Sequence, residues 1–158
     1  MVRQRHGQAE HRDQLGWEHL ERIRQRWKGK LLVKGVLAGE DARMAREKGV
    51  DGVIVSNHGG RQLDGAMATY DALQPVAEAV GEKVPVILDS GIRRGQDILK
   101  ARARGASAVA TGRVALFGAA AGPGGAEKAL DILIDELTLV MKLAGTPNFR
   151  EVDSLLLA

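Results

Sequence analysis

Hydrophobic residues along this chain form short continuous runs, separated by longer stretches in which apolar positions recur every three or four residues. The continuous runs occupy residues 30–35, 51–57, 84–91 and 106–112, and their length is that of β-strands. The periodic stretches occupy residues 38–48, 69–80, 95–104 and about 125–144, and their spacing predicts amphipathic helices. A glycine follows each of these predicted helices, which is a common way for a helix to end.

A further helix is predicted ahead of the first strand, on the apolar stripe Leu15, Leu20, Ile23 and Trp27, with Gly29 as its stop. Strands that alternate with helices indicate right-handed βαβ units and an α/β fold with a parallel sheet. Four such units make half of a (β/α)8 barrel, which typically needs about 250 residues in full. The fold predicted is therefore a parallel half-barrel, and the alternative is a small open sheet of four strands.

Composition narrows the class of protein. The 158 residues are 44% hydrophobic and 27% charged, which is typical of one globular domain. The net charge of +3 is spread among interspersed acidic and basic residues, and aromatics are only 3%, so we expect no nucleic-acid partner. Cysteine is absent, which excludes disulfides and thiolate sites, and the histidines lack metal-ligand spacing, so no metal is expected.

No apolar run approaches the roughly 20 residues of a membrane span, so no membrane segment and a cytoplasmic location are expected. We divide the chain into a polar arm over 1–14, one domain over 15–150 and a C-terminal tail over 151–158.

Unusual residues cluster where each predicted strand ends. Lys34 ends the first strand, Ser56 to His58 end the second, Asp89 to Gly91 end the third, and Gly112 and Arg113 follow the fourth. The carboxyl ends of parallel strands carry the chemistry in open α/β sheets and in barrels alike. The clustering predicts one site at this edge of the sheet.

The loop after the second strand reads SNHGGRQLDG and pairs His58 with Arg61 across two glycines. A histidine there can act as a general base, and an arginine can hold a carboxylate through two parallel hydrogen bonds. Together they favour removal of a proton next to a carboxylate. The alternative is a surface loop whose His and Arg are merely solvated.

The next two strand ends read DSGIRRG, over 89–95, and TGR, over 111–113. Glycines that expose backbone N–H groups, a helix N-terminus and the side chains of Arg93 and Arg113 predict a phosphate site. The alternative is an ordinary turn with capping residues. Lys34 is either a snorkelling surface lysine or a cofactor contact in line with the other strand ends.

These motifs, with LLVKG and the segment from Trp17 to Gly145 that contains them, resemble the FMN-dependent α-hydroxy-acid dehydrogenases and oxidases. The resemblance implies FMN as cofactor and oxidation of a small L-2-hydroxy acid to a 2-oxo acid. It implies His58 as the catalytic base and Arg61 as the ligand of the substrate carboxylate. It also implies a set of cofactor-binding residues: Lys34 and Ser56 near the flavin ring, Asp89, Ser90, Gly91, Ile92 and Arg93 along the ribityl chain and phosphate, and Gly112 and Arg113 at the phosphate.

The matched segment corresponds to strands five to eight of that family's barrel. We therefore expect the chain to self-associate or to bind a partner that supplies the other half-barrel, because its outer strands would otherwise keep unpaired edges. Three hypotheses remain open for the isolated chain: an active assembly of half-barrels, a non-catalytic module that binds FMN or phosphate, and one subunit of a split enzyme.

Overall fold

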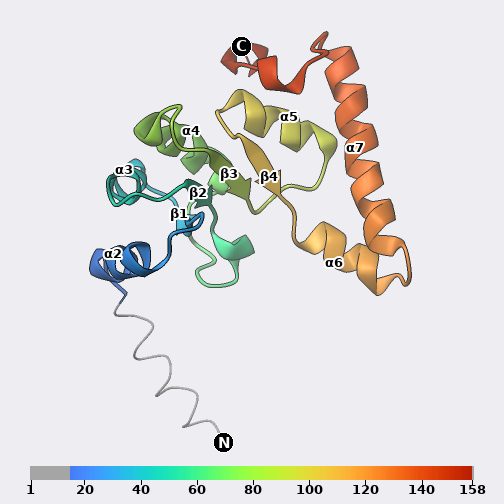
Figure 1. The fold of residues 1–158 in the computed structure, drawn as a ribbon. Coiled ribbons are helices and arrows are strands. Elements are labelled where there is room, and N and C mark those ends of the chain that lie inside the picture. The colour runs from blue at the N-terminus through green and yellow to red at the C-terminus, as the bar shows by residue number, and fades with distance from the viewer. Residues whose placement is uncertain (1–14, 158) are drawn as a thin grey trace, which may run out of the picture.

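The fold is one parallel sheet with helices packed along it (Figure 1). The computed structural model describes residues 15–157, so the predicted arm over 1–14 lies outside the described residues. The strands are β1 (Leu32–Val36), β2 (Gly52–Val55), β3 (Val86–Asp89) and β4 (Ala108–Ala110). All neighbouring strands pair in parallel, in the order β1-β2-β3-β4. The predicted parallel α/β fold is confirmed.

The helices between the strands lie close to their predicted positions. They are α3 (Gly39–Glu47), α4 (Thr69–Val80) and α5 (Gly95–Ala103), with α2 (Trp17–Arg26) ahead of β1 and α7 (Gly125–Leu143) near the C-terminus. A sequential strand order with right-handed crossovers puts every connecting helix on the same face of the sheet. This arrangement is that of a barrel segment and differs from that of a doubly wound sheet, in which helices cover both faces.

The core lies between this sheet and its helices. Its fully buried side chains come mainly from β2, β3 and α4, namely Val53, Val55, Leu88, Leu73, Val76 and Val80. Burial alternates along the central strands, since Val53, Val55, Val86 and Leu88 are buried while Ile54, Ile87 and Asp89 are partly exposed. The outer strands are less covered, since Leu32 on β1 is 42% exposed and β4 has no buried residue. Strand order explains the difference, because β1 and β4 have a neighbour on one side only.

A short helix after β4 was not predicted. Helix α6 (Arg113–Ala120) reads RVALFGAA, which has no polar face at helical spacing, so its sequence gave little periodic signal. It packs closely on α7 at a point where each helix has a glycine, Gly118 and Gly125. A Cβ at Gly118 would lie 2.9 Å from the Cβ of Ala129 and against the backbone of Gly125, so the two helices could not approach as closely with a larger residue there. The helix matters to the site because it begins where the predicted phosphate motif lies.

The C-terminal segment also packs onto the domain. Residues Phe149–Glu151 and Ser154–Leu157 form two 3-10 turns. Val152 is 6% exposed and joins Leu99 and Ala103 in a second apolar cluster beside α7. Within residues 15–157, no helix combines the length and the apolar character that crossing a bilayer requires.

Candidate active site

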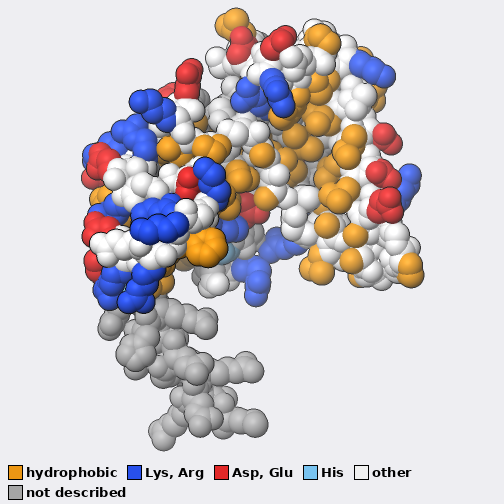
Figure 2. All heavy atoms as spheres, viewed as in Figure 1, with side chains coloured by type: hydrophobic (Ala, Val, Ile, Leu, Met, Phe, Trp, Pro, Cys, Tyr) orange, Lys and Arg blue, Asp and Glu red, His pale blue; other side chains and the backbone are white. Residues whose placement is uncertain are grey.

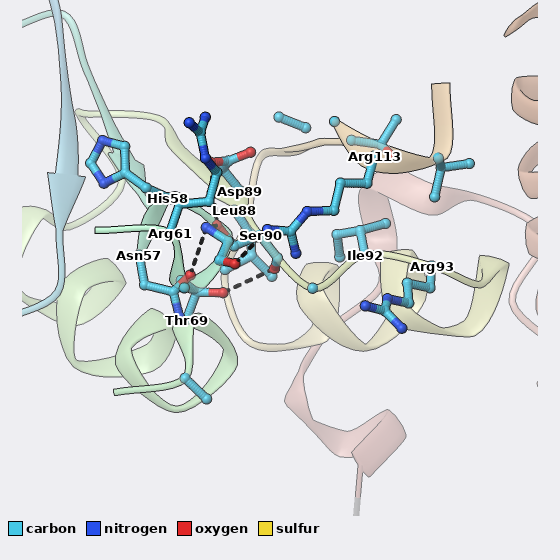
Figure 3. Close-up of a pocket in the computed structure, with 18 of the residues that line it drawn as sticks. Asn57, His58, Arg61, Thr69, Leu88, Asp89, Ser90, Ile92, Arg93 and Arg113 are labelled. Atoms are coloured by element: carbon cyan, nitrogen blue, oxygen red, sulfur yellow. Dashed lines mark hydrogen bonds between the residues drawn. The ribbon is translucent and has the colours of Figure 1, made fainter. Parts of the chain in front are cut away.

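An open cavity of about 1360 Å³ lies at the carboxyl ends of the strands (Figure 3). This exceeds the roughly 300–1,000 Å³ of a typical small-molecule pocket. The cavity is lined by most of the predicted site residues, namely Lys34, His58, Arg61, Asp89, Ser90, Gly91, Ile92, Arg93, Gly112 and Arg113. The remaining one, Ser56, is 1% exposed and does not line the cavity, but its hydroxyl donates a hydrogen bond to the lining residue Asp89. The structure brings all of these residues together, while their individual roles stay predictions.

Three strand ends contribute one polar cluster, which consists of Lys34, Ser56 and Asp89. The Lys34 ammonium donates to the Ser56 hydroxyl at 2.7 Å and forms an ion pair with the Asp89 carboxylate. The Ser56 hydroxyl in turn donates to Asp89 Oδ2 at 2.5 Å. Parallel register explains the meeting, because it aligns the ends of β1, β2 and β3 at one edge.

The cluster sets the charge of Asp89. Burial is the largest influence and acts to raise the pKa of Asp89. Hydrogen bonds from Lys34 and Ser56, the charge of Lys34 and the backbone N–H of Ser90 together outweigh it, so the pKa lies below the ordinary 3.8. Asp89 is therefore ionised at neutral pH and holds the Lys34 ammonium at the cavity.

His58 stands on a tight left-handed turn at the end of β2. Three successive residues have positive φ, with 57° at His58, 66° at Gly59 and 75° at Gly60. Two of them are glycine, which adopts this region without a Cβ penalty. The Asn57 side chain closes the turn by accepting the Gly59 N–H at 3.1 Å, and the His58 N–H donates to the Ser56 hydroxyl at 3.1 Å.

The His58 ring leans toward the end of β1 (Figure 3). A Cβ at Gly35, whose φ is +100°, would lie 3.3 Å from His58 Cε1. Gly35 also falls where the pairing of β1 with β2 shifts by one residue, between Lys34 and Val36. The glycine and the local irregularity in β1 leave room for an exposed imidazole at the cavity.

The opposite end of the cavity contains the predicted anion site, and its helix is α6. Helix α6 begins at Arg113, with Gly112 as its N-cap. The sequence also favoured the N-terminus of α5, but carboxylates already fill that position. Asp97 accepts the N–H groups of Arg93 and Arg94 at 3.0 and 2.9 Å, and Glu136 on α7 accepts that of Gly95 at 2.8 Å.

The hydrogen bond from the Gly95 N–H and, to a smaller degree, the one from Arg94 hold the pKa of Glu136 below its usual value. An anion arriving at α5 would meet two negative charges. The N-terminus of α6 and the loop around Gly91 are the part of the predicted phosphate site that remains accessible.

Three features show that this end can accommodate a phosphate group. A Cβ at Gly91 or at Gly112 would meet no atom within 4 Å, so both glycines border open space. The Thr111 hydroxyl is buried and is the one buried side-chain polar atom in the described part of the chain without a hydrogen-bond partner. Arg113 supplies a guanidinium, which in this structure reaches across to the His58 turn and donates from Nη2 to the Gly59 carbonyl at 2.8 Å.

Arg93 does not join Arg113 at one point in this structure. Figure 3 shows the Arg113 guanidinium turned toward the end of β3, whereas the Arg93 side chain lies over α5. The sequence suggested that both could reach one phosphate, and only Arg113 is directed across the cavity here.

Sequence reasoning gave no role to three polar residues of the site, namely Asn57, Thr69 and Thr111, although Asn57 and Thr111 lie within its motifs. Asn57 closes the His58 turn, and an Asn directly before a His-Gly-Gly run is a turn signal that could have identified it. Thr69 is 4% exposed and donates to the Ser90 carbonyl at 3.0 Å. Nothing local in the sequence marks that bond, because it joins the start of α4 to the end of β3.

Known proteins of one family match this chain. A family model described as FMN-dependent dehydrogenase matches residues 1–158. L-lactate oxidase from Lysinibacillus sphaericus (strain C3-41) is 48% identical over 137 residues, which are 86% of this chain and 36% of the oxidase. 2-Hydroxyacid oxidase 1 of Mus musculus is 46% identical over 143 residues, which are 90% of this chain and 39% of that protein.

A solved structure gives the same result. A soluble mutant of the membrane-associated (S)-mandelate dehydrogenase from Pseudomonas putida has a TM-score of 0.85 and 43% identity, covering 89% of this chain and 40% of that one. The chain thus spans between a third and two fifths of the length of the relatives it matches.

Proposed function

The chain belongs to the family of FMN-dependent dehydrogenases, and from this premise we propose that its strand-end cavity binds FMN and oxidises an L-2-hydroxy acid to the 2-oxo acid. One observation carries the proposal. A single cavity has a histidine and an arginine at one end, His58 and Arg61, and an accessible helix N-terminus with Arg113 at the other. The first pair suits a hydroxy acid and the second end suits the phosphate of the cofactor.

The residues at the phosphate end fit FMN. Gly91 and Gly112 leave space for an anion beside their backbone, and Thr111 and Arg113 supply a hydroxyl and a charge to bind it. Lys34 belongs to the polar cluster at the strand ends, where its ammonium would stabilise negative charge on a flavin ring. When bound, FMN supplies the acceptor for the two electrons that leave the substrate.

The chain's own residues position the substrate and move its proton. Arg61 pairs with the substrate carboxylate through two parallel hydrogen bonds. Oxidation removes two electrons and two protons from the hydroxy acid. His58 would accept one proton, and the two electrons and the second proton would pass to FMN. An imidazole suits this step because it changes charge near neutral pH.

We propose further that the exposed apolar surfaces are covered by a polypeptide that carries the βα units of the relatives that these residues do not span. Large apolar side chains on α6 and α7 are exposed, among them Leu116, Phe117, Ile132, Leu139 and Leu143. Figure 2 shows hydrophobic side chains gathered over this part of the molecule. Soluble monomers seldom leave extended apolar patches uncovered.

The catalytic base gives a second reason. Within residues 15–157, the His58 ring has no carboxylate hydrogen-bond partner. The bonds of His58 are those of its backbone, whose N–H donates to the Ser56 hydroxyl and whose carbonyl accepts the Arg61 N–H. A catalytic histidine normally needs a neighbouring group to fix its tautomer and orientation. The covering polypeptide is therefore expected to supply that group as well as to close the sheet edges.

The activity is tested by anaerobic flavin spectroscopy on the purified chain with FMN, alone and with a polypeptide carrying the first four βα units of a relative. L-Lactate, glycolate and (S)-mandelate are added, with D-lactate as stereochemical control. We expect the visible flavin band to bleach with an L-2-hydroxy acid. His58→Gln should retain FMN and lose about 10²-fold to 10⁴-fold in reduction rate, whereas His19→Gln, on helix α2 outside the cavity, should match wild type.

FMN that binds but is not reduced in any mixture would contradict the oxidation and favour a non-catalytic binding module. Sedimentation of the same mixtures tests the covering polypeptide. A 1:1 complex supports it, while a homodimer that ignores the added polypeptide, or a monomer at every concentration, contradicts it.

A further inference from the structure

Ser90 has a backbone conformation that its side chain disfavours. Its φ is +79°, and in the part of the chain that the structure describes only His58 shares a positive φ among non-glycine residues. An L-residue with a Cβ is strained in this region, which glycine adopts freely. Both strained residues line the same cavity. Strain of this kind persists where the surrounding structure fixes it, and it concentrates at functional sites.

The surroundings of Ser90 fix it from both sides. Its carbonyl accepts a hydrogen bond from the buried Thr69 hydroxyl at 3.0 Å. Its hydroxyl lies 3.4 Å from Asp89 Oδ2, 3.5 Å from the Ser56 hydroxyl, and 3.0 Å from the Gly59 nitrogen, whose N–H it accepts. The left-handed backbone is what turns this hydroxyl from the end of β3 toward the loop that follows β2.

The Gly59 bond is the one that reaches the proposed base. Gly59 directly follows His58, and its N–H is shared between the Ser90 hydroxyl and the Asn57 side chain. Its carbonyl accepts Arg113 Nη2 at 2.8 Å. The peptide groups on both sides of Gly59 are therefore held by side chains. These bonds add to the backbone bonds of the short 3-10 turn over His58–Gly60, in which the Gly60 N–H donates to the Asn57 carbonyl and the Arg61 N–H to the His58 carbonyl.

We propose that Ser90 is a positioning residue: its hydroxyl fixes the Gly59 peptide and thereby the orientation in which His58 meets the substrate. The inference rests on the function proposed above and adds to it a residue that acts through the backbone of the turn. Ser90 was predicted from the sequence to be a cofactor contact. The geometry directs its hydroxyl at the catalytic turn.

Two substitutions separate this role from a purely structural one. Ser90→Gly removes the hydroxyl and also the strain, whereas Ser90→Ala removes the hydroxyl and retains the strain. If Ser90 served only the fold, losing the bonds of its hydroxyl would lower the stability of the variants and leave the rate of the folded protein unchanged. A positioning role predicts that Ser90→Gly keeps its stability and its FMN affinity yet loses rate.

The experiment compares wild type, Ser90→Gly, Ser90→Ala and the control Ser107→Ala, an exposed serine after α5. The assay uses each FMN-loaded protein, in the complex that supports flavin reduction. We expect both Ser90 variants to reduce flavin about 10-fold to 100-fold more slowly at saturating substrate, as misplacement of a catalytic group by about 1 Å would cause, with KM little changed. Ser107→Ala should match wild type.

Amide hydrogen exchange at Gly59, followed by NMR, tests the hydrogen bond from the Gly59 N–H to the Ser90 hydroxyl and needs no turnover. Faster exchange at Gly59 in both Ser90 variants, with the core amides unchanged, is the expected result. Unchanged exchange at Gly59 overturns the inference, as does a weaker FMN affinity with an unchanged rate, which would make Ser90 a cofactor contact. If wild type itself reduces no flavin, the proposed oxidation fails, and the Gly59 exchange alone decides whether Ser90 holds the turn.

Discussion

The substitution Gly112→Ala should weaken the binding of FMN in the cavity with little change in the stability of the fold. Gly112 has a φ of −109°, which alanine adopts without strain. A Cβ there meets no protein atom within 4 Å. The methyl group would instead project beside the N-terminus of α6, into the space we assign to the phosphate.

The expected effect on stability is small because two contributions oppose each other. Replacing glycine by alanine restricts the unfolded chain and stabilises the native state by about 0.4–1 kcal/mol. Alanine is a poorer N-cap than glycine, by roughly 0.5–1 kcal/mol. The net change should lie within about 1 kcal/mol of zero.

The expected effect on cofactor binding is larger. A methyl group that displaces the phosphate removes at least one charge-assisted hydrogen bond, worth about 1.5–3 kcal/mol. At 1.4 kcal/mol for each factor of ten, the Kd for FMN should rise about 10-fold to 100-fold. Riboflavin has no phosphate, so its affinity should not change.

The assay is quenching of flavin fluorescence, with FMN and riboflavin titrated against wild type and Gly112→Ala, alongside urea unfolding of both proteins. Gly65→Ala is the matched control, since Gly65 lies on an exposed loop and its Cβ also meets nothing within 4 Å. The assignment of the phosphate to α6 would be refuted if wild type binds FMN more tightly than riboflavin and Gly112→Ala binds FMN as tightly as wild type does.

Three further predictions concern stability, each measured by urea unfolding. Gly95→Ala should destabilise by about 1–3 kcal/mol or more, because its Cβ would lie 2.6 Å from Glu136 Cβ and against the backbone of α7; an unchanged midpoint would contradict this close packing. Leu73→Ala should cost about 2–5 kcal/mol, since Leu73 is 0% exposed, while Leu155→Ala, at 78% exposed, should cost little. The Leu31 N–H, then Lys30 and Arg24, lower the pKa of Asp51 from 3.8 to about 2, so this carboxylate stabilises the fold above about pH 4 and the contribution disappears as pH falls toward 2. The unfolding free energies of wild type and Asp51→Asn should therefore converge over that range, and a constant difference would argue against the Asp51 network.

Most of the fold could be predicted because the local signals agree with one another. Helix α4 has the predicted bounds, and β2 and β3 lie inside the predicted apolar runs. Period, glycine stops and strand alternation all indicated the same βα units. Helix α6 was not predicted because its residues are nearly all small or apolar and show no polar face. Its close approach to α7 at Gly118 is a contact that periodicity does not reveal.

The membership of the site could be predicted from strand ends, but its internal bonds could not. Parallel strands bring Lys34 and Asp89 to one edge, although 55 positions separate them in the chain. Asp97 caps the start of α5 locally, from the third residue of that helix, but no local pattern reveals that Lys34 and Asp89 form an ion pair or that Glu136 also caps α5. Which helix N-terminus stays free for an anion depends on these long-range contacts, and only the structure decides it.

A crystal structure of the chain with FMN and a 2-oxo acid, formed alone or with the covering polypeptide, tests the account most directly. The account predicts the phosphate at the N–H groups of Gly112 and Arg113, the flavin ring beside Lys34, and the acid's carboxylate on Arg61 within reach of His58. Cofactor bound outside the strand-end cavity, or with its phosphate at the start of α5, would contradict it.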